Sequence, residues 1–414
     1  MASTPNQAFL HESYPDQDLI DIARNLGPVI REYSAQGERE GHMPQPMWDA
    51  LSDAGLLSLL TPKNFGGAEV DPITYSRVVE EISIHDAAAG WTLTNPLLFG
   101  VLCARLPQQG ALDIMGTDPR ARLAATFGPP LKAVPTEGGY KLSGYGTFAS
   151  NCHQALWMGA ICQIAEEGDP EIQDSGMLNP GTMKTDKPRL LWAYYPAKDC
   201  RILDNWHVMG MRGTGSNNIQ VDESFVPYHR CVPFGAEYQL GPDFQGPLYR
   251  FPFIGLAVGG LTPVALGIAR RAIDEIAALA KTKTPAGSSK LLWEHPATQY
   301  KIAQAEGAVR AGRALLYETL RERWEATLAG KEPTMDDRAG LMLAASTAAA
   351  NAALAVELAF SLSGTTGIYV DSPIERCFRD MQVVRQQRLL ADGRYETFGQ
   401  MYFGLEPDFI TIVI

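Results

Sequence analysis

One glycine-rich segment of the sequence has the residues of a ligand-binding loop. It runs from Trp206 to Asn217 and contains three glycines, the cation Arg212, and the hydroxyls of Thr214 and Ser216. Glycines let the backbone come close to a bound molecule, and a guanidinium with neighbouring hydroxyls supplies polar contacts to it. The segment therefore fits a loop that holds a ligand. It equally fits a tight hairpin in which Arg212 only ties down the turn, because short glycine motifs have many structural uses.

The composition excludes several classes of protein. A chain of 414 residues with 45% hydrophobic residues can bury a large core, and its length suggests two or three domains in one subunit. The net charge is -12 and there is no Lys/Arg-rich run, so we expect no nucleic-acid partner. The six cysteines lack the spacing of a zinc site or a disulfide framework, which fits a reducing cytoplasm and no metal. The N-terminus is polar and no apolar run approaches the roughly 20 residues of a membrane span, so neither a signal peptide nor a membrane anchor is expected.

Three stretches of different character surround this loop. Apolar residues recur at helical spacing early in the chain, so residues 1–122 are predicted to form an N-terminal helical domain. Residues 123–235 contain aromatic and alternating runs that suit strands, and they are predicted to form a compact β-domain. Residues 236–414 return to long apolar and amphipathic stretches, which predict a four-helix bundle.

Individual elements follow from the same patterns. The alternation after the glycine-rich loop predicts a strand at 218–227. A run rich in Asp, Glu, Gly and Pro at 166–187 predicts an exposed loop. The other expected elements are strands at 140–150 and 190–195, and bundle helices at 254–280, 299–328, 336–362 and 378–402.

Three motifs, taken in order, resemble the acyl-CoA dehydrogenase fold, and more closely its flavin-dependent monooxygenase branch. Residues 51–67 resemble the family's first helix pair and turn, 138–150 its flavin-binding strands, and 364–380 its C-terminal signature. The resemblance spans nearly the whole chain. It implies an α+β, mostly α subunit with an N-terminal helical domain, a middle β-barrel and a C-terminal four-helix bundle, assembled as a homotetramer.

The position of a catalytic acid separates the two branches. A dehydrogenase needs a carboxylate beside the flavin to remove a proton next to a thioester. When the chain is aligned on Asp380, the usual glutamate position falls at Arg388, and residues 251–273 contain no Asp or Glu. The resemblance therefore favours the oxygenase component of a two-component monooxygenase that acts on an aromatic, polycyclic or other sizeable organic molecule. An acyl-CoA dehydrogenase or oxidase with a relocated base, with Glu396 as the nearest acid, is the alternative, and an inert scaffold is a third.

The cofactor expected from the resemblance is a reduced flavin, FMNH2 or FADH2, together with O2. In the dehydrogenases an Arg and a Phe reach the FAD of the neighbouring subunit, and here those positions are Pro285 and Ser288. This favours a flavin supplied by a separate flavin reductase, although a reorganised loop that holds FAD in another way is the alternative. Reduced flavin forms a C4a-hydroperoxide with O2, which decays to peroxide unless N5 is hydrogen-bonded and water is kept away.

The resemblance assigns roles to residues of the β-domain. It places Ser150 at N5 as a catalytic hydroxyl and Phe148 against the flavin ring. Thr126, Phe127 and Gly128 would line the flavin edge. Without the motif around them, Ser150 would be an ordinary hydroxyl at a strand end and Phe148 a core residue.

The glycine-rich loop and the C-terminal motif complete the expected cofactor site. Arg212, Thr214 and Ser216 would bind the flavin phosphate or close the substrate pocket, with Trp206 as an apolar wall. From the C-terminal signature, Gly364 and Thr365 are expected to contact the cofactor.

The residue at the family's catalytic-base position differs in this chain. Several relatives use a His near the C-terminus to activate a phenol, and the matching position here is Gln387. A glutamine can orient a substrate but cannot take a proton at neutral pH. Either another group, such as His153 or His85, supplies the base, or the substrate needs none. For each of these histidines taken alone, a structural or solvated role is favoured over a catalytic one.

The pocket is expected to differ in shape from that of the family. Gly146 stands where the family often has Trp, which suits a large substrate. Five side chains are plausible walls, and core packing would explain each of them equally well. They are Trp91, Asn95, Phe99, Phe251 and Phe253.

Overall fold

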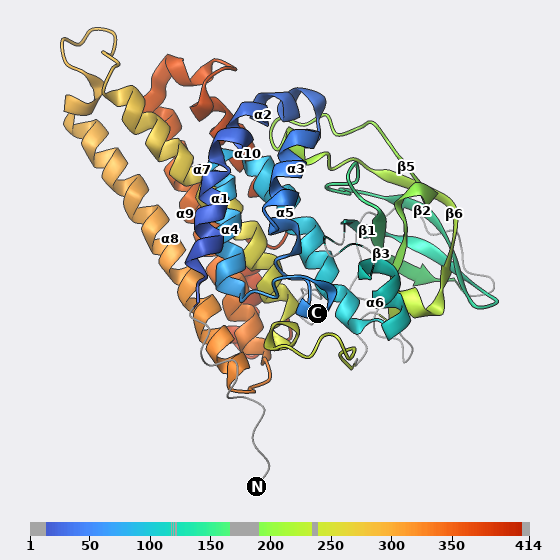
Figure 1. The fold of residues 1–414 in the computed structure, drawn as a ribbon. Coiled ribbons are helices and arrows are strands. Elements are labelled where there is room, and N and C mark those ends of the chain that lie inside the picture. The colour runs from blue at the N-terminus through green and yellow to red at the C-terminus, as the bar shows by residue number, and fades with distance from the viewer. Residues whose placement is uncertain are drawn as a thin grey trace.

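Helices make up one side of the molecule and strands the other (Figure 1). The structure is a computed structural model, and it describes residues 14–116, 118, 120, 122–165, 190–233 and 239–407. The loop predicted at 166–187 lies outside these residues. The change from helix to strand and back falls close to the predicted boundaries at 122 and 235.

Side-chain caps mark where some of the N-terminal helices begin. The helices are α1 (Gln17–Asn25), α2 (Gly27–Glu40), α3 (Gln45–Asp53), α4 (Pro72–His85), α5 (Ala87–Val101) and α6 (Gln108–Met115), with a 3-10 turn η4 (Leu102–Arg105) after α5. The carboxylate of Asp71 accepts the backbone N–H groups of Ile73 and Thr74, and that of Asp86 accepts the N–H of Ala89. These bonds satisfy donors that the first turn of a helix leaves free.

The bundle is formed by the helices that follow the sheet. They are α7 (Phe253–Ala280), α8 (Pro296–Leu328), α9 (Met335–Ser363), α10 (Pro373–Val384) and α11 (Gly393–Tyr402). Small residues on α7 let α4 approach closely: a Cβ at Gly260 would lie 2.0 Å from the hydroxyl of Tyr75. The N-terminal helices α4 and α5 therefore pack directly on the bundle and share its core.

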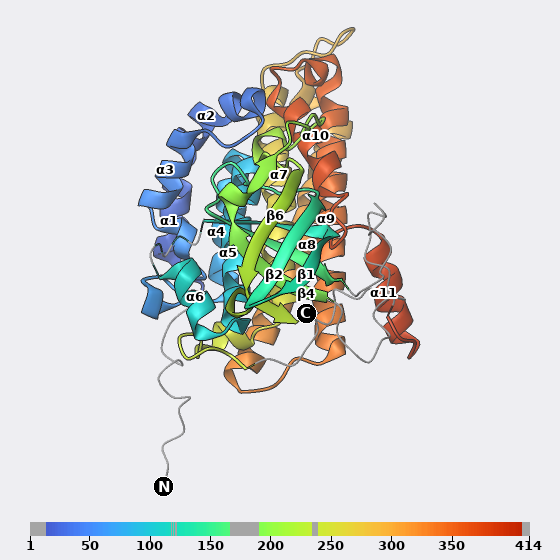
Figure 2. The same ribbon diagram turned by 90° about the vertical axis from the view of Figure 1, so that its right-hand side faces the viewer.

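The last predicted element is two helices, not one. The chain turns at 385–392, between α10 and α11, so the expected helix at 378–402 was wrong. The side-chain oxygen of Gln387 accepts the backbone N–H of Leu389 at 2.5 Å, and such a local bond competes with a continuing helix. After this turn α11 stands away from the rest of the bundle and packs on α9 (Figure 2).

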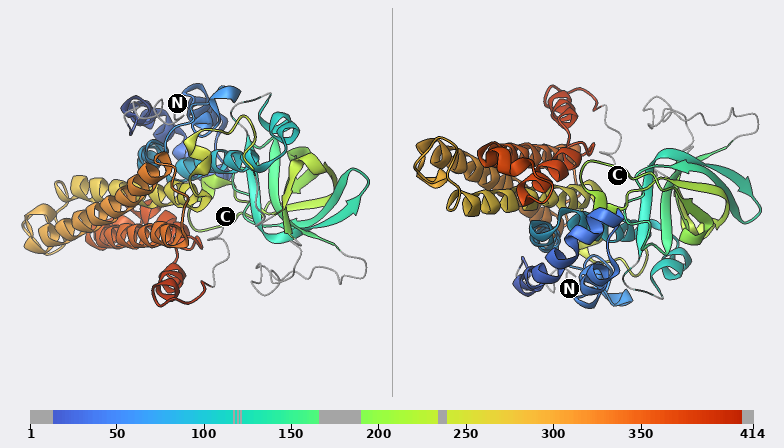
Figure 3. Two further views of the ribbon diagram at one scale, coloured as in Figure 1. Left: turned by 90° about the horizontal axis from the view of Figure 1, so that it is seen from below. Right: turned by 90° about the horizontal axis from the view of Figure 1, so that it is seen from above.

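The strands form one strongly curved sheet. They are β1 (Leu123–Thr136), β2 (Gly139–Gly146), β3 (Trp157–Ile164), β4 (Leu190–Pro196), β5 (Cys200–Ile202), β6 (Ile219–Pro227) and β7 (Cys231–Pro233). Their order is β5-β6-β2-β1-β3-β4-β7, with β1 and β3 parallel and the other neighbours antiparallel. The sheet curls around its own core, which includes Leu131, Leu142 and Tyr195 (Figure 3). Within the described residues no ladder joins β5 to β7, so hydrogen bonds do not close the predicted barrel.

Apolar helices of considerable length lie inside the molecule. In the part of the chain that the structure describes, three helices are long and apolar enough to cross a membrane by length and composition alone. They are Ala87–Arg105, Phe253–Ala280 and Met335–Ile368, and 89%, 94% and 67% of their apolar windows are buried in the fold. The expectation that no apolar run approaches this length was therefore wrong. A helix that is apolar all round suits the interior of a large protein as well as a membrane.

Candidate functional site

Three hydroxyls form a continuous chain where the sheet meets α5. Ser150 Oγ lies 2.6 Å from Ser216 Oγ, and Ser216 Oγ lies 2.7 Å from Thr214 Oγ1. Thr214 Oγ1 in turn donates to the backbone carbonyl of Met211 at 2.8 Å. All three side chains are buried. We call Ser150, Ser216 and Thr214 the hydroxyl chain.

The hydroxyl chain ends at the carbonyl of Met211, and this acceptor sets the direction in which the hydroxyls donate. A carbonyl oxygen can only accept, so the hydrogen of Thr214 points at Met211. Ser216 must then donate to Thr214, and Ser150 must donate to Ser216, because each short O···O contact needs one hydrogen. Trp91 Nε1 donates to Ser150 Oγ at 3.2 Å and uses one of its lone pairs. With the hydrogens assigned in this way, Ser150 has one acceptor position left and no hydrogen to give.

Backbone contacts hold the two segments of this site together. The segment after β2, residues 148–151, donates its Ala149 N–H to the carbonyl of Asn217 at 2.9 Å and its Asn151 N–H to that of Thr214 at 3.0 Å. Phe148 and Asn151 both have left-handed φ angles, 57° and 67°. Such angles are uncommon for residues other than glycine and often accompany functional turns.

An aromatic pair, one exposed ring and one half-buried ring, borders the hydroxyl chain. The side chain of Phe148 is 66% exposed, and its ring meets the ring of Trp206 edge-on at a centroid distance of 6.1 Å. Trp206 Nε1 donates to the Met211 carbonyl at 3.3 Å, which ties this ring to the same loop. An exposed ring beside buried hydroxyls is a surface on which a planar apolar ligand can stack.

The glycine-rich loop is anchored to α10 from behind. Asp380 Oδ1 accepts the backbone N–H of Met211 at 2.5 Å, and Arg379 donates to the carbonyl of Met209. Arg376 links this anchor to Asp86 at the start of α5 by an ion pair of 2.7 Å. Burial raises the pKa of the Asp380 carboxyl to about 6, against the opposing effect of Arg376. The loop that carries Thr214 and Ser216 is therefore fixed from the bundle as well as from the sheet.

Arg212 is free to meet an anionic group. It lies in the 3-10 turn η7 (Arg212–Thr214) with an exposed side chain, and its guanidinium makes no hydrogen bond or ion pair with a described residue. The predicted flavin edge lies on β1, where Gly128 accepts the hydroxyl of Thr147 at 2.6 Å. A Cβ at Gly128 would meet nothing within 4 Å, so there is open space on that side.

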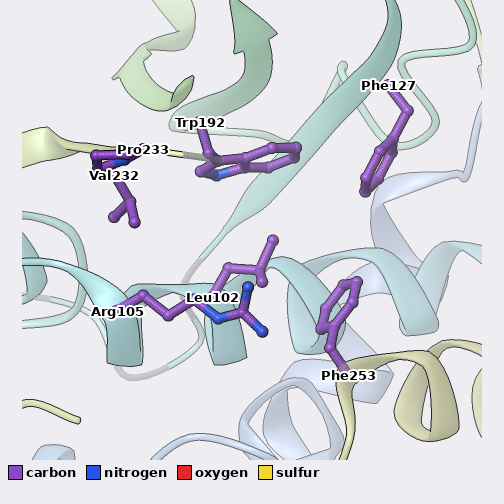
Figure 4. Close-up of a pocket in the computed structure, with 7 residues that line it drawn as sticks. All are labelled: Leu102, Arg105, Phe127, Trp192, Val232, Pro233 and Phe253. Atoms are coloured by element: carbon purple, nitrogen blue, oxygen red, sulfur yellow. The ribbon is translucent and has the colours of Figure 1, made fainter. Parts of the chain in front are cut away.

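An aromatic pocket lies further along α5. It is open to solvent and lies between η4 on one side and β4 and β7 on the other (Figure 4). Phe127 and Trp192 pack at a centroid distance of 5.2 Å, and Phe99 supports both from behind at 5.8 and 6.0 Å. We call it the tryptophan pocket; its lining residues are Leu102, Arg105, Phe127, Trp192, Val232, Pro233 and Phe253. None of them is an acid.

Several predicted site residues come together and others do not. Trp91, Phe148, Ser150, Trp206, Thr214 and Ser216 form one cluster, and Phe127 and Phe253 line the tryptophan pocket. Asn95 donates to the carbonyl of Trp91 in its own helix, and Phe251 is buried against Trp324. Thr126 is buried, and its hydroxyl has no hydrogen-bond partner among the described residues.

The predicted catalytic groups other than Ser150 have structural contacts. His153 Nε2 contacts the Asn217 amide at 2.9 Å, and burial followed by the nearby His42 lowers its pKa. His85 lies at the end of α4 against Arg31, and burial lowers its pKa to about 4. The contact of Gln387 is the local turn described above. These positions give no support to any of the three as the base.

Two further predicted positions lie on the surface of the molecule. Gly364 and Thr365 begin the 3-10 turn η11 (Gly364–Ile368) and are exposed, next to the exposed side chains of Tyr369 and Val370. Glu396, the nearest acid considered for a dehydrogenase, is exposed on α11. Neither position contributes to the hydroxyl chain or to the tryptophan pocket.

Important residues of the site were missed from the sequence. Arg105 and Trp192 line the pocket, and Asp380 anchors a loop that lies 169 residues earlier in the chain. Asn217 was quoted only as the end of the glycine-rich segment, yet its Oδ1 accepts the backbone N–H groups of Asn205 and Trp206. Of these residues only Asp380 belongs to a motif recognised in the sequence, the C-terminal one, and could have been identified from it.

The site fits a flavin. An exposed aromatic ring, an exposed cation and buried hydroxyls with a free acceptor position match a planar ring system with polar edges and a phosphate. Along α5, Trp91 and Phe99 are eight residues apart, roughly 12 Å at the rise of an α-helix. The hydroxyl chain and the tryptophan pocket therefore lie along the same helix and its continuation.

Comparisons with known proteins agree with this geometry. The family models "Acyl-CoA dehydrogenase, N-terminal domain" and "Acyl-CoA dehydrogenase, C-terminal domain" match residues 22–104 and 260–391. Indole-3-acetate monooxygenase of Pseudomonas putida is 33% identical over 383 residues, which cover 91% of this chain and 92% of the relative. The FADH(2)-dependent resorcinol hydroxylase, oxygenase component, of Rhizobium sp. is 27% identical, with 98% of each chain covered. The crystal structure of 3-HSA hydroxylase from Rhodococcus sp. RHA1 shares the fold, with a TM-score of 0.85, 24% identity, and 97% and 100% of the chains covered.

Proposed function

Since the chain belongs to the acyl-CoA dehydrogenase family, in its branch of flavin-dependent monooxygenases, we propose that the hydroxyl chain binds the reduced flavin and the tryptophan pocket the substrate. The observation that carries this proposal is the direction of the hydroxyl chain. Ser150 offers an acceptor and no hydrogen. Reduced flavin has an N–H at N5 to donate, whereas oxidised flavin has only an acceptor there. The site is thus matched to the reduced cofactor.

The residues of the chain perform the positioning and the exclusion of water. Reduced flavin, when bound, supplies two electrons to O2, so that one oxygen atom enters the substrate and the other leaves as water. Ser150 accepts the N–H of the ring edge, and Phe148 and Trp206 cover the ring with apolar surface. Arg212 balances the phosphate. Burial of the hydroxyl chain keeps bulk water from this edge, which opposes the loss of the activated oxygen as peroxide.

The substrate is an aromatic molecule. The tryptophan pocket has aromatic walls, which suit an aromatic ligand. Two relatives with the name indole-3-acetate monooxygenase, 33% and 28% identical, support such a substrate. Among the described residues no acid lines the pocket, so they give the dehydrogenase alternative no support from a base.

The partners follow from the two-component chemistry. A separate flavin reductase supplies the reduced flavin, since relatives are oxygenase components. The chain acts as a homo-oligomer, a tetramer, in the cytoplasm. Support for the oligomer comes from apolar side chains that one copy leaves open to water, with Val370 88% and Phe403 79% exposed. Sedimentation of the purified protein tests the tetramer, which a stable monomer would contradict.

Binding and reoxidation of flavin test the proposed function. Under anaerobic conditions we expect the protein to bind photoreduced FMN or FAD at least tenfold more tightly than the oxidised form. When this complex is mixed with O2 in a stopped-flow instrument, bound flavin should reoxidise in more than one phase and more slowly than free flavin. Failure to bind reduced flavin, or reoxidation at the rate of free flavin, would contradict the proposal. Reduction of bound oxidised flavin by an acyl-CoA would support the dehydrogenase instead.

A further inference from the structure

We infer that Asp380, on α10 of the bundle, is a positioning residue of the flavin site. Through the backbone of Met211 it keeps the hydroxyl chain in the direction that accepts a hydrogen from reduced flavin. The inference rests on the proposed function and makes it more specific. Asp380 is buried, and it acts through one residue of the glycine-rich loop, which lies 169 residues earlier in the chain.

Met211 connects the bundle to the hydroxyl chain and to Trp206. Its N–H donates to Asp380 Oδ1 at 2.5 Å. Its carbonyl accepts from Thr214 Oγ1 at 2.8 Å, from the Thr214 N–H at 3.1 Å and from Trp206 Nε1 at 3.3 Å. The N–H belongs to the peptide before Met211 and the carbonyl to the peptide after it. The place of this carbonyl therefore depends on the φ and ψ angles of Met211.

The conformation of Met211 needs a restraint from its surroundings. Its φ of 55° and ψ of 27° lie in the left-handed region, which is costly for a residue with a side chain. The bond to Asp380 supplies such a restraint. At the preceding Gly210, a Cβ would lie 2.4 Å from the carbonyl oxygen of Arg379, so the loop backbone lies directly against α10. Without Asp380 we expect Met211 to relax and its carbonyl to turn away from Thr214.

The ion pairs around Asp380 also position the other end of the hydroxyl chain. Arg376 Nε lies 3.6 Å from Asp380 Oδ2, and the same guanidinium lies 2.7 Å from Asp86. The Asp86 carboxylate caps the first turn of α5. Trp91, five residues further along α5, donates to Ser150. Helix α10 therefore holds both the acceptor at which the hydroxyl chain ends and the helix whose tryptophan contacts its first hydroxyl.

Flavin titrations of two variants at Asp380 test the inference. Asp380→Ala removes the acceptor of the Met211 N–H, whereas Asp380→Asn removes the charge and keeps a side-chain oxygen. Under anaerobic conditions Asp380→Ala should lower the ratio of the affinities for reduced and oxidised flavin at least about threefold, and Asp380→Asn should keep this ratio within about twofold of the wild type. A residue with only a structural role would lower both affinities equally. An unchanged ratio in Asp380→Ala, or an equal fall of the ratio in Asp380→Asn, would overturn the inference.

A substitution that leaves every charge in place provides a second test, which also serves if Asp380→Ala does not fold. Gly210→Ala puts a Cβ against the backbone of α10 and should move the loop away from Asp380, so the ratio should fall in the same direction. Gly399→Ala is the matched control, because a Cβ at Gly399 on α11 would meet nothing within 4 Å. A wild-type ratio in Gly210→Ala would contradict the inference.

Titration of the wild-type protein separates this inference from the proposed function. If the wild type does not bind reduced flavin, the proposed function itself fails. If the wild type binds it and the ratio is unaffected in Asp380→Ala and Gly210→Ala, only the role of Asp380 is contradicted.

Discussion

Replacement of Ser216 by alanine should remove the preference of the site for reduced flavin. In the wild type the hydrogen of Ser150 is held by Ser216, whose own hydrogen is held by Thr214. Ser216→Ala breaks this chain at its middle. Ser150 can then turn its hydrogen towards the ligand and donate to the N5 acceptor of oxidised flavin, while its lone pairs still accept an N–H.

The size of the effect follows from the bond that is gained. One additional hydrogen bond contributes about 0.5–1.5 kcal/mol, so affinity for oxidised flavin should rise about 2- to 13-fold. Affinity for reduced flavin should change less, because Ser150 and Trp91 still form their contact. For a two-electron couple, a tenfold change in the ratio of the two affinities corresponds to about 30 mV in the midpoint potential of the bound flavin. The potential should therefore move in the direction that favours the oxidised form.

Equilibrium titration with oxidised and photoreduced flavin measures both affinities, and spectroelectrochemistry measures the potential independently. Thr214→Val should act in the same direction, since it removes the acceptor that orients Ser216. Ser224→Ala is the matched control, because this hydroxyl donates to Asp199 on another part of the sheet. An unchanged ratio of affinities in both Ser216→Ala and Thr214→Val would refute the assigned direction of the hydroxyl chain.

Three further predictions concern the surroundings of the site. Phe148→Ala should weaken flavin binding at least fivefold and change the free energy of unfolding by less than about 0.5 kcal/mol. The exposed control Phe225→Ala should change neither quantity. A large loss of stability in Phe148→Ala would contradict the role of Phe148 as a ligand surface. Gly146→Ala should destabilise the protein by about 1–3 kcal/mol in urea unfolding, because its Cβ would lie 2.8 Å from Thr126 Oγ1. The same substitution should destabilise the Thr126→Ala protein less. Equal destabilisation in the two backgrounds would contradict this reasoning. Burial raises the folded-state pKa of Asp380 from 3.8 to about 6. The protein therefore keeps its full stability at low pH, where this carboxyl is protonated, and loses stability as the pH rises through about 6. The stability of Asp380→Asn relative to the wild type should therefore rise between about pH 4 and about pH 7, and a relative stability that falls over this range in urea unfolding would oppose this.

Local patterns in the sequence identified most elements of the fold. The predicted helices at 254–280, 299–328 and 336–362 agree with α7, α8 and α9 to within three residues at each end, because long helices have a periodic apolar face that the chain itself displays. The strand expected at 218–227 is β6 for the same reason, with a period of two. The helix at 378–402 was wrong because the turn at Gln387 depends on one side-chain bond, which periodicity does not detect.

The sequence predicted the site residues that lie within a single motif, and it missed those that only tertiary packing brings together. Ser150, Thr214 and Ser216 lie in motifs whose residue types already suggest a polar loop, and the structure brings them together. Arg105 and Trp192 were missed because the pocket exists only where η4 meets β4, and neither residue has a pattern of its own. Asn95 and Phe251 lie on the expected elements, but their contacts are with their own helix and with Trp324. The direction in which a side chain points depends on tertiary packing that the sequence does not display.

Isotope labelling tests most directly whether this protein is a monooxygenase. The purified protein is combined with a flavin reductase, FMN or FAD, a reductant, an indole or phenol, and 18O2, and the product is analysed by mass spectrometry. We expect one 18O atom in each molecule of product, and none when H2 18O replaces the labelled gas, because the transferred oxygen comes from O2. Consumption of the reductant with release of peroxide and no labelled product, across a panel of indoles and phenols, would contradict the account.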